Sequence, residues 1–141
     1  MSNVRSPTAA ADAVGLLDTS VVIRLPQLVQ EDLPERPLIS AITLAELSVA
    51  PLVATTPQER AARQLVLQQA EADFEPLPFD AGAARAFGQV AASLRRDGRK
   101  VKARSYDAMI AAIALANRLP VYTANPDDFE GIDGLTVRVV Q

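Results

Sequence analysis

The fold is decided by residues 105–123, which read SYDAMIAAIALANRLPVYT. This stretch predicts a helix from Ser105 to about Asn117. Alanine, isoleucine and leucine lie on nearly every side of that helix, and a helix that is apolar all round is expected to be buried. A short strand, Val121-Tyr122-Thr123, follows it. A buried helix that leads into a strand is a unit of the α/β fold class.

The rest of the chain continues this alternation of helices and strands. Val14-Gly15-Leu16-Leu17 is an apolar run that ends at Asp18-Thr19-Ser20, a pattern that predicts a buried strand followed by a turn or helix cap. We expect these further elements: a short helix from about Ser20, a strand at Leu38-Ile39-Ser40, helices at Ile42–Val49 and Pro57–Ala72, an extended segment at Phe74–Phe79, a helix capped by Asp80 that runs to about Arg96, and a strand from about Leu135 to Val139. The alternation predicts an α/β fold with a mostly parallel central sheet and helices on both faces.

The length and composition favour one globular domain. The chain has 141 residues, of which 49% are hydrophobic and 22% are charged. We expect a flexible tail at residues 1–13 and one domain at residues 14–141. No segment approaches the ~20 consecutive apolar residues of a transmembrane helix, and residues 1–12 lack the apolar stretch of a secretory signal. We therefore expect a cytoplasmic protein without a membrane partner.

The amino-acid composition excludes several kinds of catalysis. The chain contains no histidine, cysteine or tryptophan. It can therefore form no disulfide, thiolate nucleophile or structural zinc site, and no Ser-His-Asp triad. An enzyme of this composition has to use Asp and Glu, either as acid/base pairs or as oxygen ligands of Mg²⁺ or Mn²⁺.

Acidic residues follow the predicted strands at four places. Asp18 ends the first strand, and Glu46 lies in the first turn of the helix after the second. Asp107 opens the alanine-rich helix, and Asp127 and Asp128 come after the strand that follows this helix. Open α/β sheets bind ligands beyond the carboxyl ends of their strands. These acids are therefore candidate site residues.

Each of these acids also has a purely structural interpretation. Asp18 fits a helix N-cap, Asp107 fits a first-turn acid favoured by the helix dipole, and Thr43 with Glu46 fits a capping box. The two acids after residue 126 fit a turn. However, Glu46 and Asp107 have mostly apolar neighbours, and charges beside buried elements are costly unless they are paired or bind a metal. Carboxylates around one or two hard cations can activate a water that attacks a phosphodiester.

A basic segment contrasts with the net charge of −3. Between Arg85 and Arg104 there are seven basic residues and one acid, Asp97, which gives a local charge of +6. Such a segment can be a solvated helix end, because cations suit a helix C-terminus, or a patch that binds phosphate groups. The best candidates for phosphate contacts are Arg95, Arg96, Arg99, Lys100 and Arg104.

Four segments of the chain resemble the motifs of a known enzyme family. They are Leu16–Ile23 around Asp18, Thr43–Leu47 around Glu46, Ser105–Ala112 around Asp107, and Thr123–Phe129 with its acids. In order and spacing they resemble the four acidic motifs of PIN-domain ribonucleases. The pattern as a whole resembles the VapC group, the toxins of type II toxin–antitoxin pairs.

The resemblance implies a PIN-like domain that acts as a Mg²⁺- or Mn²⁺-dependent endoribonuclease. Such an enzyme cuts structured RNA such as tRNA or ribosomal RNA, inhibits translation and is neutralised by a cognate antitoxin. Family members commonly form homodimers and larger complexes with the antitoxin. With RNA as the substrate, the basic residues named above become candidate RNA-binding residues.

The resemblance also assigns roles to single residues. By motif match, the catalytic and metal-binding acids are Asp18, Glu46, Asp107 and Asp128. Asn125 is expected as a polar neighbour of the fourth acid, and Asp127 as a lesser candidate for that position. Ser20 and Thr123 are expected to orient a carboxylate or a bound water through their hydroxyl groups, whereas Thr19 is expected to be a cap or turn residue.

Other interpretations of the chain are open at this point. A receiver-like signalling domain shares the size and the order of elements, but it needs a lysine near the end of a late strand, and the lysines here are Lys100 and Lys102. A phosphohydrolase needs a second acid two residues after Asp18, where this chain has Ser20. A non-catalytic interaction protein would use all its acids as helix caps.

A groove for an antitoxin helix is expected among the early helices. Its candidate lining residues are Leu25, Leu28, Leu44, Leu47 and Leu52. These leucines fit the hydrophobic core equally well.

Overall fold

The computed structural model describes residues 12–141. Its helices and strands run in the order β1 (Val14–Leu17), α1 (Thr19–Arg24), β2 (Arg36–Leu38), α2 (Ala41–Val49), α3 (Pro57–Asp73), α4 (Ala81–Arg96), α5 (Ser105–Ala116), β3 (Val121–Thr123) and β4 (Val137–Val139), with short 3₁₀ turns between some of them. The four strands form one sheet in the order β2-β1-β3-β4. Every strand pair is parallel. The prediction of an α/β fold with a mostly parallel sheet is therefore confirmed.

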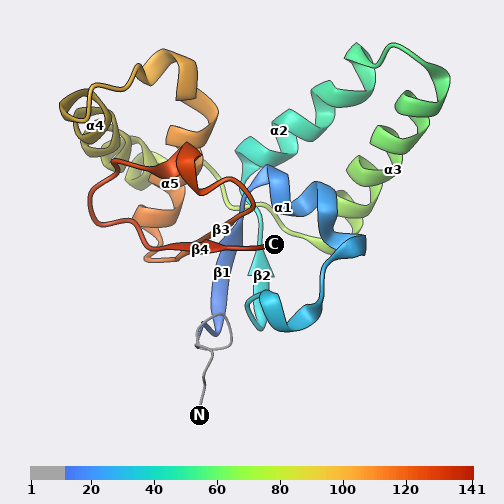
Figure 1. Ribbon diagram of the computed structural model, residues 1–141, viewed down its shortest axis with the longest axis horizontal. Helices are drawn as coiled ribbons and strands as arrows, with labels where there is room; N and C mark the ends of the chain where they lie inside the picture. Colours follow the sequence, from blue (N-terminus) through green and yellow to red (C-terminus); the bar gives the residue numbers. More distant parts are fainter. Residues whose placement is uncertain (1–11) are drawn as a thin grey trace.

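Helices cover both faces of the sheet because successive residues of a strand point to opposite faces. In β1, Leu16 belongs to the core cluster that contains residues of α4 and α5. Its neighbour Leu17 belongs to a second cluster, with residues of α1, α2 and α3. In Figure 1 the α2–α3 hairpin and the α4–α5 pair rise as two arms beyond the carboxyl ends of the strands. The sheet therefore forms the floor between two helical arms.

A polar network lies at the other end of the sheet, where β1 begins. The Tyr122 hydroxyl donates a hydrogen bond of 2.7 Å to Asp12 Oδ2, and Arg138 Nε donates another of 2.7 Å to the same oxygen. The Tyr122 ring passes directly over Gly15, where a Cβ atom would lie only 2.5 Å from the ring. Glycine at position 15 therefore allows the ring to reach Asp12.

Two predicted strands differ from the structure at their boundaries. β2 spans residues 36–38 and not 38–40, because the Ser40 side chain accepts a hydrogen bond from Thr43 N and so caps α2. Pro37 is tolerated in β2 because the strand lies at the edge of the sheet. β4 begins at Val137, two residues later than position 135. The helices at 57–73 and 81–96 agree closely with the prediction.

The start of the described chain is bonded to the domain. Residues 1–11 of the expected tail lie outside the described residues. Asp12 and Ala13 accept backbone hydrogen bonds from Glu35 and Arg36. Within residues 12–141, no helix is both long and apolar enough to cross a membrane.

Candidate active site

Asp18 lies at the carboxyl end of β1 and is almost completely buried, with 3% of its surface exposed. Its Oδ1 accepts hydrogen bonds from Ser20 Oγ at 2.6 Å and Val21 N at 3.1 Å, so it also caps α1. Its Oδ2 accepts a bond of 2.6 Å from the hydroxyl of Thr123, the last residue of β3. Burial raises the pKa of Asp18 in spite of these bonds. Three hydrogen bonds thus hold the carboxylate where the carboxyl ends of β1 and β3 meet.

Glu46 lies in α2, on the side of the helix that faces α1. The capping-box interpretation is wrong, because Ser40 caps this helix. The Glu46 side chain instead accepts a hydrogen bond of 2.6 Å from Thr19 Oγ1, which also lies 3.0 Å from Thr43 Oγ1. Burial raises the pKa of Glu46, and the negative charge of Asp18 adds to this effect. Thr19 therefore orients the Glu46 carboxylate by a hydrogen bond. The sequence had predicted only a cap or turn residue at this position.

Asp107 lies in the first turn of α5, across from these two acids. Its pKa is raised to about 7 by burial and then by the negative charges of three other carboxylates. These are Asp128, Glu46 and Asp18, in decreasing order of effect. Arg104 opposes the shift only in part. The other three carboxylates are therefore close enough to make Asp107 harder to ionise.

The turn after β3 presents Asp128 to this cluster. Asp128 N donates a hydrogen bond of 3.0 Å to the carbonyl of Asn125, whose own N donates to Thr123 Oγ1 at 2.9 Å. Ala124 N donates to Ser20 Oγ at 3.1 Å. Asn125 thus acts here through its main chain, which links the turn to the hydroxyl groups that hold Asp18.

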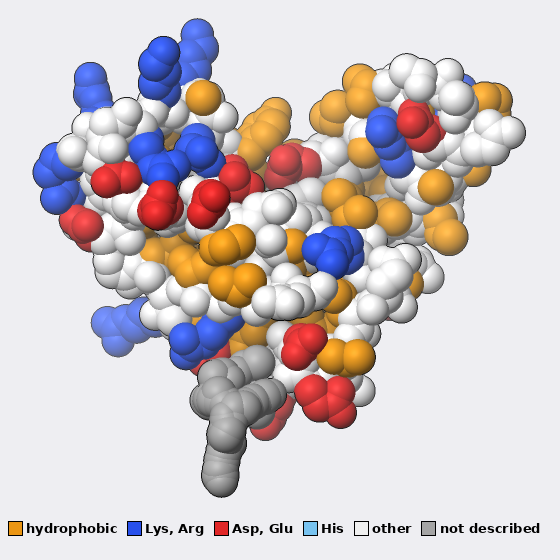
Figure 2. All heavy atoms as spheres, in the orientation of Figure 1, with side chains coloured by type: hydrophobic (Ala, Val, Ile, Leu, Met, Phe, Trp, Pro, Cys, Tyr) orange, Lys and Arg blue, Asp and Glu red, His pale blue; other side chains and the backbone are white. Residues whose placement is uncertain are grey.

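The surface of the molecule places these acids between the two arms. Figure 2 shows acidic side chains at the base of the hollow, basic side chains gathered on the α4–α5 side, and hydrophobic side chains on the α2–α3 side. Among residues 12–141, Arg104 is the arginine that pairs with an acid of this cluster, its Nη1 lying 3.1 Å from Asp128 Oδ1. One cation against four carboxylates leaves the cluster negatively charged.

The chain is similar to known proteins in sequence and fold. A model of the PIN domain family matches residues 15–135. Ribonuclease VapC5 of Mycobacterium tuberculosis is 42% identical over 125 residues, which are 86% of this chain and 90% of that protein. The chain belongs to the PIN-domain family, among the VapC ribonucleases.

A second relative and a solved structure agree with this assignment. The tRNA(fMet)-specific endonuclease VapC of Shigella flexneri is 35% identical over 97 residues, 69% of this chain and 70% of that protein. The crystal structure of VapBC-5 from Mycobacterium tuberculosis, a member of the VapBC family of toxin-antitoxin systems, has a TM-score of 0.78 at 42% identity. It covers 92% of this chain and 98% of that chain. The family predicted from the four acidic motifs is therefore confirmed, and the receiver-like and non-catalytic alternatives are set aside.

The donor set of this VapC site suits a hard divalent cation. Its candidate ligands are all carboxylate oxygens, which Mg²⁺ and Mn²⁺ prefer, and their excess negative charge needs a counter-charge. In the described part of the chain, no three acidic side chains form a ready-made metal-binding group as they stand. Hydrogen bonds from Ser20, Thr123 and Thr19 and the ion pair with Arg104 engage these carboxylates instead.

The basic segment of this VapC chain is partly neutralised by ion pairs. Arg96 pairs with Asp133 at 2.7 Å, and Arg99 pairs with Asp97 at 2.9 Å and with Glu130. Arg95 and Lys100 are exposed. Asp127 is exposed as well, and its carbonyl accepts a bond of 3.4 Å from Arg99. Of the five candidates for phosphate contact, Arg104 lies directly beside the acidic cluster.

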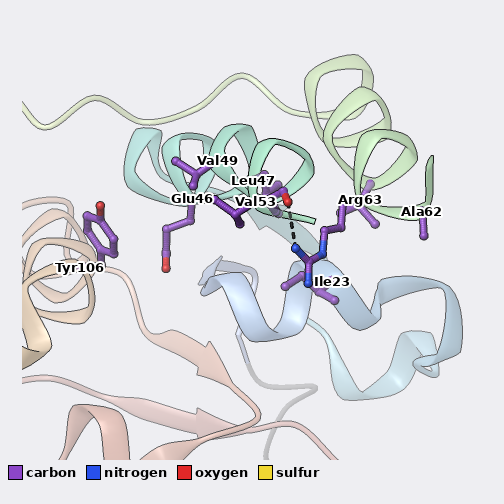
Figure 3. Close-up of a pocket in the computed structure, with 10 residues that line it drawn as sticks. Ile23, Glu46, Leu47, Val49, Val53, Ala62, Arg63 and Tyr106 are labelled. Carbon is purple, nitrogen blue, oxygen red and sulfur yellow. Dashed lines mark hydrogen bonds between the residues drawn. The ribbon is translucent and has the colours of Figure 1, made fainter. Parts of the chain in front are cut away.

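An apolar groove of about 710 Å³ opens beside Glu46. Its lining includes Ile23, Leu47, Val49 and Val53 on one side and Tyr106 on the other (Figure 3). Arg63 lies at its far end, where Nη1 donates a bond of 2.9 Å to the Ala50 carbonyl.

The leucines expected to line a groove lie mostly elsewhere. Of the five, Leu47 alone lines this cavity within the described chain. Leu25 and Leu28 pack against the core cluster under α1. Leu52 is 81% exposed. Helical spacing shows which face is apolar but not which part of that face the neighbouring helix covers.

Proposed function

We propose that this VapC ribonuclease is a Mg²⁺- or Mn²⁺-dependent endoribonuclease toxin that acts in the cytoplasm. It cuts structured RNA, either tRNA or ribosomal RNA, and so inhibits translation. The observation that carries the proposal is the coupling of Asp107 to Asp128, Glu46 and Asp18, which raises its pKa to about 7. These carboxylates come from four separate parts of the chain, and the charges of the other three oppose the ionisation of Asp107.

The proposal gives these carboxylates the role of metal ligands. Asp18, Glu46, Asp107 and Asp128 would hold one or two cations. When bound there, the metal supplies an activated water as the nucleophile and stabilises the leaving oxygen of the phosphodiester. Asp107 has to be ionised to bind, and with a pKa of about 7 it releases its proton near neutral pH.

The residues around the carboxylates orient them. Ser20 and Thr123 each donate a hydrogen bond of 2.6 Å to Asp18, one to each carboxylate oxygen. Thr19 does the same for Glu46. Asp18 Oδ1 also accepts a hydrogen bond from Val21 N, so Asp18 Oδ2 and the bonded oxygen of Glu46 are the ones that keep a second lone pair for a cation while their donors fix their direction.

Asp128 is the preferred fourth ligand. Of the three neighbouring carboxylates, Asp128 raises the pKa of Asp107 the most. Its charge also raises the pKa of Asp18. Asp127 contributes to neither of these shifts and is exposed. Arg104, which pairs with Asp128, lies where it can contact a phosphate of the bound RNA.

Cleavage of RNA by the purified chain tests this proposal. With Mn²⁺ we expect cuts that leave 5′-phosphate ends, and no cuts in excess EDTA. Asp18→Asn should abolish cleavage with the fold retained. Full activity in EDTA, or cyclic or 3′-phosphate ends, would show that the RNA's own 2′-hydroxyl is the nucleophile.

We further propose that a cognate antitoxin binds the groove of about 710 Å³. VapBC-5, the toxin–antitoxin relative described above, supports such a partner. Ile23, Val49 and Val53 line this groove together and are 50%, 49% and 61% exposed, which makes one wall of it an exposed apolar patch. An apolar face of a partner helix would cover them and at the same time close the approach to Glu46.

Co-purification with the antitoxin tests this partner. Val53→Asp should weaken the complex, whereas Leu65→Asp should not, because Leu65 is 56% exposed but does not line the groove. Equal retention by both variants would place the antitoxin elsewhere. We expect a homodimer and larger complexes with the antitoxin, which the mass of each species in light scattering would establish.

A further inference from the structure

Tyr106 is an exposed aromatic residue beside the acidic cluster. It has 54% of its surface exposed, whereas the other aromatic side chains of residues 12–141 are buried or half-buried. It precedes Asp107 in the first turn of α5. In Figure 3 its ring stands across the groove from Val49 and Glu46. The fold thus leaves a flat apolar surface in water next to a candidate catalytic acid.

The Tyr106 ring also borders a second cavity, which is lined mainly by polar and charged residues. It has a volume of about 400 Å³ and is lined by Glu46 and by residues 102–107. Lys102 and Arg104 supply positive charge to it, and Glu46 and Asp107 supply negative charge. Tyr106 belongs to the lining of this cavity as well as to that of the apolar groove. The ring therefore lies where the acidic cluster, two cations and an apolar wall meet.

These groups match the parts of a nucleotide. Lysine and arginine bind backbone phosphates. An exposed aromatic ring stacks on a nucleobase, whichever base it is, because every base has a π-face. Glu46 and Asp107 repel phosphates and offer no flat surface to a base. Tyr106 is the aromatic ring in the lining of both cavities, so it is the group there that can stack on a base.

We propose that Tyr106 forms a nucleobase-binding subsite. Its ring stacks on an unpaired base adjacent to the phosphate that is cut, while Lys102 and Arg104 contact the flanking phosphates. The proposal rests on the proposed ribonuclease function and deepens it. It requires the base next to the cut to be out of any duplex, because a paired base presents no free face.

The first test is the rate of RNA cleavage. Tyr106→Phe keeps the ring and should change kcat/KM less than about twofold, whereas Tyr106→Leu should lower it about tenfold. Leu65→Ala, at an exposed apolar position that lines neither cavity, serves as the control. Replacing the nucleotide next to the cut by an abasic one should slow the wild type to the rate of Tyr106→Leu and should slow that variant no further.

The second test measures binding without cleavage. A single-stranded RNA with 2-aminopurine next to the cut is titrated into the Asp107→Asn protein, and stacking should quench its fluorescence. The quenching should disappear in the double variant that carries Tyr106→Leu together with Asp107→Asn.

The outcomes separate this subsite from the ribonuclease function. If the wild type cuts RNA and Tyr106→Leu cuts and quenches equally well, the subsite is wrong and the function stands. If quenching depends on Tyr106 but cleavage persists in excess EDTA, the metal-dependent function is wrong and the subsite stands. If Tyr106→Leu impairs antitoxin binding alone, the ring serves the protein partner and the subsite is wrong.

Discussion

The carboxylates at the two ends of the sheet have pKa shifts of opposite direction. At the amino end of β1, burial would raise the pKa of Asp12, but hydrogen bonds from Arg138 and Tyr122 and the charge of Arg138 lower it overall. At the carboxyl end, burial raises the pKa of Asp18 and the hydrogen bonds that it accepts do not reverse the shift. Asp12 has a cation in contact, whereas Asp18 has other carboxylates nearby.

This difference separates a structural from a functional use of the same residue type. A neutralised carboxylate stabilises the folded chain, and an accumulation of like charges opposes folding. The second arrangement is retained where a ligand supplies the missing counter-charge. The repulsion between carboxylates is thus concentrated at the carboxyl end of the sheet, between the helical arms.

The largest effect should come from the acidic end. Asp107→Asn removes a charge from the cluster without changing its shape, and we expect RNA cleavage with Mn²⁺ to fall at least about a hundredfold. The circular dichroism spectrum should not change. A variant with normal cleavage would show that Asp107 is no part of the catalytic site.

A substitution at the amino end of β1 should lower the stability of the fold without lowering the rate of RNA cleavage. Asp12→Asn removes the ion pair with Arg138, whose Nε lies 2.7 Å from Asp12 Oδ2. We expect the free energy of unfolding in urea to fall by about 1–2 kcal/mol. Cleavage under folding conditions should stay within about twofold. A loss of cleavage comparable to that of Asp107→Asn would contradict the division between the two ends.

A smaller effect is expected from a residue that orients an acid. Thr19→Val removes the hydroxyl that donates a hydrogen bond of 2.6 Å to Glu46. We expect kcat/KM to fall about tenfold, which is the scale of losing a group that orients a metal ligand. Thr19→Ser keeps the hydroxyl and should restore most of the rate. If Thr19→Ser is as slow as Thr19→Val, the methyl group and its packing matter and the hydrogen bond does not.

The smallest effect is the pH dependence of stability without metal. The pKa of Asp107 is about 7 in the folded chain and 3.8 in a model peptide, so the folded state binds the proton more tightly. Its contribution to stability is therefore greatest at low pH and is lost as the pH rises through 7. Asp107→Asn should be more stable than the wild type by about 1 kcal/mol near pH 8, since solvent screens a half-exposed group, and by nothing near pH 4. If the variant and the wild type have equal urea midpoints at pH 8 as well as at pH 4, the coupling of Asp107 to the other acids is wrong.

Local patterns predicted most of the fold. The apolar helix after Ser105, Pro57 at the start of α3 and Asp80 before α4 are signals contained in a few neighbouring residues, and each appears where it was expected. The boundary of β2 was predicted two residues too late, because Ile39 is buried like a strand residue although Ser40 already caps the next helix. Burial and strand pairing are separate properties that a short apolar run does not distinguish.

The candidate acids also followed from the sequence, but their partners did not. The motif match selected Asp18, Glu46, Asp107 and Asp128. That Thr19 donates to Glu46 and that Arg104 pairs with Asp128 depends on contacts across 27 and 24 residues of chain. No local rule describes such a contact, because it depends on how α1, α2 and α5 pack.

The sequence by itself determined which residue types carry the chemistry, since a chain without histidine and cysteine has only oxygen ligands to offer. It also determined the order of the elements, through helix caps, prolines and apolar spacing. The tertiary structure alone decided that the acids share one electrostatic field, that Arg104 enters it, and that Tyr106 stays exposed between two cavities. The physical reason is that electrostatic coupling and solvent exposure depend on distances in space, which are established only when the two helical arms pack against the same sheet.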